Sequence, residues 1–331
     1  MTQSRLMLSV VVPIFNEEAI LEELYERLSR VLVGLKLSYE VIFVDDGSAD
    51  RSASWLERIA GTDPAIRLVQ LSRNFGLSIA VTAGLDHASG QLVALMDGDL
   101  QDAPEDLPRL IAKAQEGYDV VYAVRVKRKE SWIKRTTVFL FYRLLNRIAS
   151  TPLPVDSGLF SVMSRSVVDA LKRMPERSRY VSGLRAWIGF KQCGIPFERS
   201  ARRSGAPQQT MRKLSRMALD GMLSFSHVPL RIATYAGLFA AALSGIGIAW
   251  AMWMRLFSHQ PPAGWTSMVL IILFLGSVQL LALGIIGEYL GRVYDEVKGR
   301  PLYVVRQRLG FQRAEQEEPD GDQLSYAHRL S

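Results

Sequence analysis

Along the first 125 residues, short apolar runs alternate with longer segments in which apolar positions follow helical spacing. The apolar runs have the length of strands and lie at 8–15, 39–48, 65–72 and 91–95. Residues 17–35 have the spacing of a helix, a second helix is expected from about Ser52, and 77–88 is an apolar packing segment. Apolar strands that alternate with helices predict an α/β fold with a parallel sheet covered on both faces.

Polar clusters directly follow three of these strands. They read FNEE at 15–18, DDGS at 45–48 and DGDLQD at 97–102. In sheets of this class ligands bind beyond the carboxyl ends of the strands, and all three clusters are expected at that edge. This coincidence is the first indication of a functional site.

The second half of the chain has a different pattern. Segments near 132–149 and 211–226 are amphipathic, with basic residues beside an apolar face. Ordinary core helices can show such a pattern, but the basic content and the apolar segments that follow favour helices lying in a membrane interface.

Two uninterrupted apolar segments lie further on. Residues 232–254 and 266–287 are 23 and 22 residues long, contain no charge, and can each cross a hydrocarbon layer of roughly 30 Å. Buried helices of a soluble protein are the alternative reading. The length and the lack of charge favour two membrane helices, at about 232–254 and 266–288, joined as a hairpin.

Charge around this hairpin predicts its orientation. The connection holds one basic residue, Arg255, and more basic residues flank the hairpin on the other side. The flanking residues are Arg212, Lys213, Arg216, Arg231, Arg292, Lys298 and Arg300. The positive-inside rule therefore places both termini in the cytoplasm.

The expected organisation has three parts. Residues 1–228 form a cytoplasmic domain that includes the two interface helices, and 229–291 form the membrane hairpin. Residues 292–331 form a cytoplasmic segment that is expected to be flexible after about residue 311, where polar and acidic residues dominate.

Composition narrows the class of partners and the compartment. The net charge of +7 is concentrated in basic clusters at 125–147 and 199–216, which suit nucleic acid, anionic lipid or phosphate-bearing ligands. The single cysteine, Cys193, excludes an internal disulfide and fits a reducing compartment. No signal peptide is evident at the N-terminus.

The acids after the fourth strand form a candidate metal site. Asp97 and Asp99, with Gly98 between them, can place oxygens around Mg²⁺ or Mn²⁺, and Gln101 can add an amide oxygen. A D-x-D sequence alone is a weak signal, since a solvated turn has the same composition. Its position after a buried strand favours the metal site. Asp102 is expected to help start the next helix.

The other acids have two readings. The Asp45–Ser48 cluster is an Asx turn and helix cap, or Asp46 hydrogen-bonds a nucleobase or ribose beside a metal–diphosphate site. Glu17 is a helix N-terminal acid or a nucleoside contact. The sequence lacks G-x-G-x-x-G after the first strand and lacks G-x-x-x-x-G-K-[ST], which disfavours a dinucleotide dehydrogenase and a P-loop ATPase. With four histidines, a histidine-rich metal hydrolase is also disfavoured.

Five ordered motifs together resemble the family-2 glycosyltransferases of GT-A fold. They are VVPIFNEE, VIFVDDGSADRS, LSRNFGLSIAVTAGLDHASG, LMDGDLQDAPE and GEYLGRVYDEVKGRPLY. The resemblance spans about 8–305. It is greatest to the polyprenyl-phosphate sugar transferases related to dolichol-phosphate mannose synthase, in the bacterial undecaprenyl-phosphate glucosyltransferase subgroup with two C-terminal membrane helices. It implies a GT-A catalytic domain with a mixed, mainly parallel sheet.

The resemblance also implies roles for individual residues. Asp97 and Asp99 fall on the family's D-x-D, with Asp99 and Gln101 as metal ligands. Arg125 matches an arginine that contacts phosphate, Arg135 lies where the lipid phosphate approaches, and Arg202 lies on a loop that closes over the donor. The positions that match the family's nucleoside contacts are Pro13, Phe15, Glu17, Val44 and Asp46.

Asp156 matches the family segment in which a catalytic base has been proposed. The acceptor of such a reaction is a phosphomonoester with a second pKa of about 6, so it is largely dianionic at neutral pH and has little need of a base. Asp156 can instead orient a sugar hydroxyl or hold an arginine. We therefore leave its role open between base and positioning group.

The resulting expectation is a metal-dependent, inverting transfer of a sugar from a nucleotide-sugar, with UDP-glucose favoured, to undecaprenyl or another polyprenyl phosphate. The resemblance implies a multi-pass protein of the bacterial inner membrane that forms a homo-oligomer, a tetramer among relatives, with no nucleic-acid partner. A non-catalytic nucleotide-binding scaffold and a processive polysaccharide synthase are the alternatives. Three departures from the family pattern, Ser161, Ala206 and Gln208, put the identity of the donor sugar in doubt.

Overall fold

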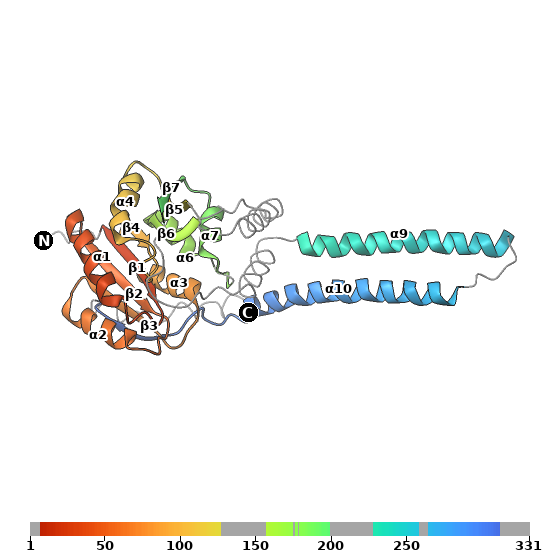
Figure 1. The fold of residues 1–331 in the computed structure, drawn as a ribbon, viewed down its shortest axis with the longest axis horizontal. Coiled ribbons are helices and arrows are strands. Elements are labelled where there is room, and N and C mark those ends of the chain that lie inside the picture. The colour runs from red at the N-terminus through yellow and green to blue at the C-terminus, as the bar shows by residue number, and fades with distance from the viewer. Residues whose placement is uncertain are drawn as a thin grey trace, which may run out of the picture. The chain divides into compact units, whose positions relative to one another are not determined.

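The computed structural model describes residues 7–126, 157–174, 176–177, 179–198, 228–257 and 264–311. The chain divides into two compact units. The first comprises Met1–Arg143, Thr151–Thr210 and Arg300–Ser331, and the second comprises Leu144–Ser150 and Met211–Gly299. The first unit contains the sheet, and the second contains two long helices (Figure 1).

The first unit is built on an eight-stranded sheet in the order β7-β5-β6-β4-β1-β2-β3-β8. Strands β1 to β5 and β7 are parallel to one another, while β6 and β8 run antiparallel to their neighbours. The strands are β1 Leu8–Ile14, β2 Tyr39–Asp45, β3 Ile66–Leu71, β4 Leu92–Leu95, β5 Val120–Val126, β6 Ser157–Ser164, β7 Gln192–Glu198 and β8 Val305–Leu309. The predicted α/β class with a mixed, mainly parallel sheet is confirmed.

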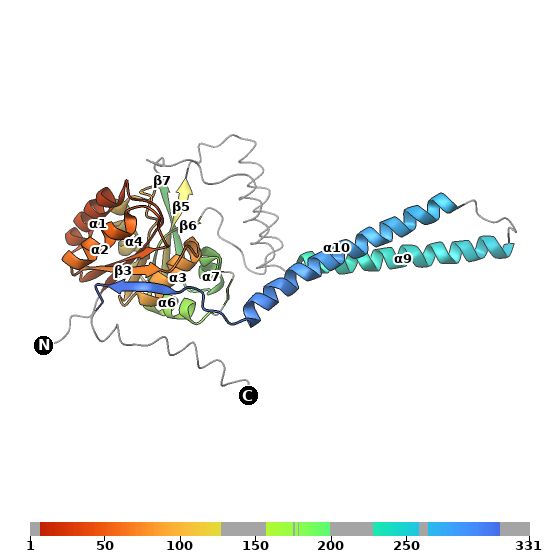
Figure 2. The same ribbon diagram turned by 90° about the horizontal axis from the view of Figure 1, so that it is seen from below.

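Helices cover both faces of this sheet. Helices α1, α2 and α4 cover one face, and α3, α6 and α7 cover the other (Figure 2). Their bounds are α1 Leu21–Leu35, α2 Ser52–Thr62, α3 Leu77–His87, α4 Leu107–Gln115, α6 Arg165–Lys172 and α7 Val181–Trp187, with a 3₁₀ turn at Pro104–Asp106 before α4. The expected helix at 17–35 and the helix expected from Ser52 are both present.

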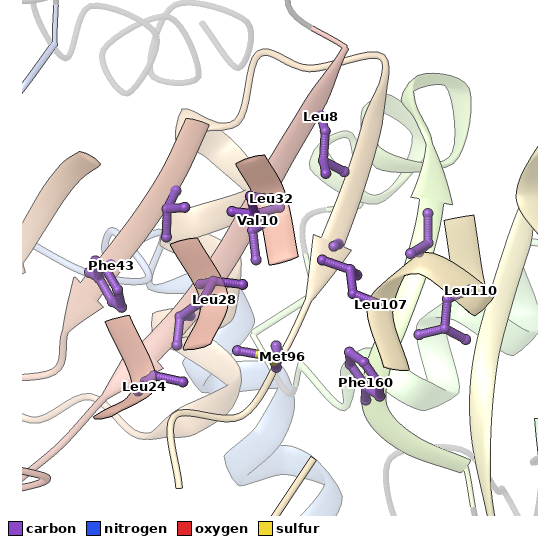
Figure 3. Close-up of a cluster of buried hydrophobic side chains, with 14 of the residues drawn as sticks. Leu8, Val10, Leu24, Leu28, Leu32, Phe43, Met96, Leu107, Leu110 and Phe160 are labelled. Atoms are coloured by element: carbon purple, nitrogen blue, oxygen red, sulfur yellow. The ribbon is translucent and has the colours of Figure 1, made fainter. Parts of the chain in front are cut away.

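The spacing of the leucines in α1 explains how this helix packs on the sheet. Leu24, Leu28 and Leu32 recur every four positions, so they line one side of α1 and point at the sheet (Figure 3). All three are fully or almost fully buried, together with Val10 of β1 and Phe43 of β2. Burying a leucine or phenylalanine side chain stabilises the folded state by about 1.5–3 kcal/mol, which holds α1 against the centre of the sheet.

Helix α1 begins four residues later than the sequence pattern predicts. The intervening chain forms a turn in which the Ile20 N–H donates to the Glu17 carbonyl oxygen over 3.0 Å. Asn16 adopts a left-handed backbone conformation, with φ of 55°. The polar residues of this segment hydrogen-bond a neighbouring loop rather than continuing the helix.

A strand that the sequence analysis did not predict completes the sheet. After the second long helix the chain forms β8, which pairs with β3, and the Ser72 N–H donates to the Val304 carbonyl oxygen over 2.9 Å. The Tyr303 hydroxyl donates to the Asp86 carboxylate over 2.9 Å. The chain between the second long helix and residue 311 is therefore part of the folded first unit.

The second unit contains α9, Val228–Phe257, and α10, Trp265–Val297, which pack against each other. Within the described residues, Phe274–Val297 is long and apolar enough to cross a membrane, and Ala233–Gly247 is a shorter apolar stretch. The predicted hairpin is thus present as two helices. The second membrane span, the orientation and the three-part division at 228 and 291 stay predictions. The expected interface helices near 132–149 and 211–226, and the segment after residue 311, lie outside the described residues.

Helix α3 lies close to β1 because one of its residues has no side chain. A Cβ atom on Gly84 would lie 2.2 Å from Val11 Cγ1 and 3.1 Å from Val44 Cγ2. Such distances require the helix or the strand to move. Gly61 of α2, in contrast, has no atom of the described residues within 4 Å of the corresponding position.

We expect Gly84→Ala to lower the free energy of unfolding by about 1–3 kcal/mol, because the added methyl group overpacks the contact between α3 and β1. Gly61→Ala should leave the stability unchanged or raise it by up to about 1 kcal/mol, because alanine is the better helix former. Denaturant unfolding of both purified variants in detergent checks this pair. Equal effects of the two substitutions would contradict the proposed close packing.

Candidate active site

The carboxyl ends of β1, β2 and β4 lie at one edge of the sheet. Pro13 is paired with Val44, and Ile14 with Asp45, in the register of β1 and β2. On the other side of β1, Val11 is paired with Leu95, the last residue of β4. The chain order reverses between β1 and β4, which makes this edge the topological switch point at which α/β sheets bind ligands.

Gly98 brings the chain after β4 against the end of β1. The Met96 N–H donates to the Val11 carbonyl oxygen over 3.1 Å, which continues the pairing beyond β4. A Cβ atom on Gly98 would lie 2.8 Å from the Pro13 carbonyl oxygen and 2.5 Å from Ile14 Cδ1. Only a glycine allows this approach, and it fixes Asp97 and Asp99 next to the switch point.

The turn that carries Asp99 is held by its own residues. The Gln101 backbone N–H donates to Asp99 Oδ1 over 3.1 Å, and Gln101 Nε2 donates to Asp99 Oδ2 over 2.8 Å. Leu100 has a left-handed conformation, with φ of 55°, and buries its side chain almost completely. The leucine anchors the turn in the core, while Asp97 and Asp99 on either side of Gly98 remain half-buried.

These residues fit a metal ion that is shared with a substrate. Within the described ranges, no group of three or more His, Cys, Asp or Glu side chains is arranged to hold a metal. Magnesium is usually bound by one or two carboxylates together with substrate phosphates, and Asp97 and Asp99 supply two carboxylates at a ligand-binding edge. Gln101 uses its amide nitrogen to support Asp99, so its role as a direct ligand stays a prediction that requires the amide to turn.

Asp46 is buried and holds the start of α3. Its carboxylate accepts hydrogen bonds from the Phe75 N–H over 2.7 Å and from the Gly76 N–H over 2.9 Å. Burial raises the pKa of Asp46, and the two backbone N–H groups oppose that increase because they stabilise the anion. The next residue, Gly47, has a φ of +70°, and a Cβ atom there would lie 2.6 Å from the Arg73 carbonyl carbon.

Asp45 forms the turn that its composition predicts. Its Oδ1 accepts from the Ser48 N–H over 3.1 Å, and its Oδ2 accepts from Gln70 Nε2 over 3.4 Å. The acids after β2 are therefore bound to their own loop and to the loop after β3. A nucleoside contact by Asp46 stays a prediction.

The loop after β1 is bound to the loop after β2. The Asn16 N–H donates to Ser48 Oγ over 3.0 Å, and Asn16 Oδ1 accepts from the Ala49 N–H over 2.8 Å. The Glu17 N–H donates to Ser52 Oγ over 3.1 Å. Sequence reasoning did not single out Asn16, although asparagine is one of the few residues that adopts the left-handed conformation found here. Phe15, beside it, is 40% exposed.

The remaining predicted site residues do not belong to these loops, and most of them are described only in part or not at all. Arg125 is the penultimate residue of β5, in register with Phe197 of β7, and only its backbone is described. Asp156, Arg135 and Arg202 lie outside the described residues, as do the departures Ala206 and Gln208. Ser161 is buried in β6 beside Leu95, and its Oγ donates to the Leu159 carbonyl oxygen over 2.8 Å.

The structure therefore brings together seven of the predicted residues around one edge: Pro13, Phe15, Glu17, Val44, Asp46, Asp97 and Asp99, with Gly98 as the contact between the β1 and β4 ends. Their individual roles stay predictions.

Comparison with known proteins gives consistent matches along the chain. The model of the glycosyl transferase family 2 matches residues 9–172, and the model of the GtrB C-terminal hairpin matches 228–293. An uncharacterized glycosyltransferase, YkcC, from Bacillus subtilis is 42% identical over 305 residues, 92% of this chain and 94% of that protein. A second uncharacterized glycosyltransferase, sll0501 from Synechocystis, is 44% identical over 92% of this chain and 96% of its own length.

A relative with a more specific name is the SfII prophage-derived bactoprenol glucosyl transferase of Shigella flexneri, 40% identical over 90% of this chain and 97% of that protein. A solved structure of glucosyl-3-phosphoglycerate synthase from Mycobacterium tuberculosis is more distant, with 22% identity and a TM-score of 0.48, covering 66% of this chain and 77% of that one. That likeness is too distant to bear on the site. On the sequence matches, the chain belongs to glycosyltransferase family 2 and carries a GtrB C-terminal hairpin.

Proposed function

We propose that this protein transfers a sugar from a nucleotide-sugar, with UDP-glucose as the favoured donor, to undecaprenyl or another polyprenyl phosphate. The observation that supports this most is the contact of Gly98 with Pro13, which places two carboxylates at the ligand-binding edge of the sheet. The acceptor is suggested by the relative named bactoprenol glucosyl transferase, which this chain matches over 90% of its length.

The donor is proposed to lie across the ends of β1, β2 and β4. Its nucleoside would contact the loops after β1 and β2, where the Phe15 ring is partly exposed and Pro13 and Val44 are neighbours in register. Its diphosphate would lie at Asp97 and Asp99. A bound Mg²⁺ or Mn²⁺ would there offset the charge that develops on the departing nucleoside diphosphate.

The protein's own contribution is then to hold the reacting groups in line and to stabilise the departing nucleoside diphosphate. The contact of Gly98 with the end of β1 fixes the backbone at Asp97 and Asp99, so this backbone needs no rearrangement when the donor binds. Arg125 and Arg202 are proposed to contact the donor phosphates, and Arg135 the lipid phosphate. The acceptor phosphate is largely dianionic at neutral pH, so it can attack the anomeric carbon directly, and in-line attack inverts that carbon. Asp156 serves as base or as an orienting group.

The second unit is proposed to keep the acceptor near this site. A polyprenyl tail remains in the bilayer, so a transferase that lies at the membrane surface gains a high local concentration of acceptor. The apolar side chains of α9 and α10 are largely exposed in the described part of the chain, as expected of helices that face lipid. We propose two membrane spans, with the catalytic domain and both termini on the cytoplasmic side of a bacterial inner membrane, and a homo-oligomeric assembly.

A donor panel tests the proposed reaction. Purified full-length protein in detergent is given undecaprenyl phosphate, Mg²⁺ or Mn²⁺ and each of several UDP- and GDP-sugars, and glycolipid is detected by mass spectrometry. We expect one donor, UDP-glucose first, to give a product that EDTA abolishes and that added metal restores. Product formation at the full rate in EDTA would contradict the metal site, and no product from any donor would contradict the proposed reaction.

Asp99→Asn removes a charge without changing the size of the side chain. We expect kcat to fall by at least about 100-fold, because one of the groups that hold the diphosphate and its metal is lost, while the thermal midpoint changes little. Asp169→Asn on α6 is the matched control, since it removes only a half-exposed ion pair with Arg165 at 3.6 Å. Steady-state assays of both variants check this, and an Asp99→Asn enzyme with most of its activity would count against the site.

Gly98→Ala tests the backbone contact itself. The added methyl group must push the turn away from Pro13, so we expect kcat/KM to fall by at least about 10-fold. Gly90→Ala is an equally tight substitution at the opposite edge of the same strands, where a Cβ atom would lie 2.6 Å from the Ser9 nitrogen. This control should lower the thermal midpoint and leave kcat of the folded enzyme unchanged. The same loss of kcat in both variants would show that general strain, and not the site, is responsible.

A further inference from the structure

The largest side chain that the structure buries completely is a cation, Arg185 of α7. Its guanidinium carbon lies 4.9 Å from the centroid of the Tyr122 ring, and its Nη2 donates to the Gly158 carbonyl oxygen over 3.4 Å. Within the described part of the chain, its Nε and Nη1 have no hydrogen-bond acceptor. Burial lowers the pKa of Arg185 to about 10, so the group keeps its charge at neutral pH.

A charge in this environment does not stabilise the fold. An ionised group loses its hydration on burial, and unmet N–H groups add to that cost. Replacing such a group by an apolar side chain of similar volume is often neutral or stabilising. Folding alone therefore gives no reason for an arginine at this position.

A neighbouring buried arginine shows the contrast. Arg179 donates through Nη1 to the Met174 carbonyl oxygen over 2.6 Å and through Nη2 to the Leu171 carbonyl oxygen over 3.0 Å. These carbonyls lie at and just after the end of α6, so Arg179 has an ordinary structural role as a helix cap. Among the described residues, Arg179 lacks an acceptor only for Nε, whereas Arg185 lacks one for both Nε and Nη1.

The location of Arg185 relates it to the proposed active site. Helix α7 packs on β6, and Gly158 is the second residue of that strand. Strand β6 runs antiparallel to β4, with Ser161 beside Leu95, so the start of β6 lies beyond the end of β4. This is the edge of the sheet at which Asp97 and Asp99 follow β4. Arg185 thus contacts the backbone at the start of β6, at the same edge of the sheet as the proposed site.

We propose that Arg185 is a positioning residue for sugar transfer: its buried guanidinium group fixes the start of β6 at the site edge. The inference rests on the proposed function. It predicts a larger effect on turnover than on donor binding. The proposed nucleoside and metal contacts lie on β1, β2 and β4, whereas Arg185 acts through Gly158 on β6, whose start is paired with the end of β5 that carries Arg125. A displacement of about 1 Å in a supporting element can reduce the rate of a reaction 100-fold without removing any substrate contact.

Arg185→Met and Arg185→Lys test this in the full-length protein, with Arg179→Met as the matched control. For each protein we would measure the thermal midpoint, the affinity for UDP with Mn²⁺ by calorimetry, and kcat with the active donor. We expect Arg185→Met to keep or raise the thermal midpoint, to lose roughly 10- to 100-fold in kcat, and to change the affinity for UDP by much less than it changes kcat. Arg185→Lys should recover part of that loss, because it keeps the charge and a donor.

The control should behave in the opposite way. Arg179→Met should lower the thermal midpoint, because the α6 carbonyls lose their donors, and should leave kcat of the folded enzyme unchanged. An Arg185→Met enzyme with wild-type kcat, or one in which kcat and the thermal midpoint fall together as in a destabilised protein, would overturn the inference. Turnover by the wild-type protein reports on the proposed function alone, so a failure of that function is distinguished from a failure of the role of Arg185.

Discussion

The close approach of Gly98 to the end of β1 is the contact on which the geometry of the site depends. Pro13 and Ile14 end β1, which pairs with β2 and β4 inside the eight-stranded sheet. A turn that packs directly on this backbone is held in place by the strand. Because Asp97 and Asp99 flank Gly98, their positions are set by a backbone contact rather than by long side chains.

Helix packing supports the same strand from another direction. Gly84 lets α3 lie directly on Val11 of β1. Val11 is two residues before Pro13, which Gly98 contacts. The start of α3 is in turn held by Asp46, whose carboxylate accepts from two backbone N–H groups of the loop that precedes the helix. The central strand, the helix on its face and the loop at its edge therefore stabilise one another.

Buried acids in this protein serve two different purposes. Glu40, near the opposite edge of the sheet, accepts from Ser9 and Ser89 and forms an ion pair with Arg67 Nε at 2.8 Å, so it is a structural carboxylate within the core. Asp97 and Asp99 are half-buried in the turn that packs against Pro13. The density of acids at a strand end is therefore not sufficient to identify a ligand site, and the partners of each carboxylate have to be known.

Strand β8 builds the part of the chain that follows α10 into the sheet of the first unit. The residues after α10 pair with β3 and bury Phe311 beside His87 of α3, with ring centroids 5.5 Å apart. The segment that follows the hairpin is thereby built into the sheet that carries the site.

The sequence by itself determined the first four strands, the helices that follow the first two of them, the class of the fold, the position of the D-x-D turn and the family. These features depend on apolar periodicity and on short motifs, which are local along the chain. It did not determine strands β6 and β8, the late start of α1, the structural role of Asp46 or the environment of Arg185. Each of these depends on partners far away in the sequence: Leu95 pairs with Ser161, Leu68 with Leu309, and Asp46 with Phe75. No periodic pattern encodes which distant backbone group a side chain meets, so only the tertiary structure decided them.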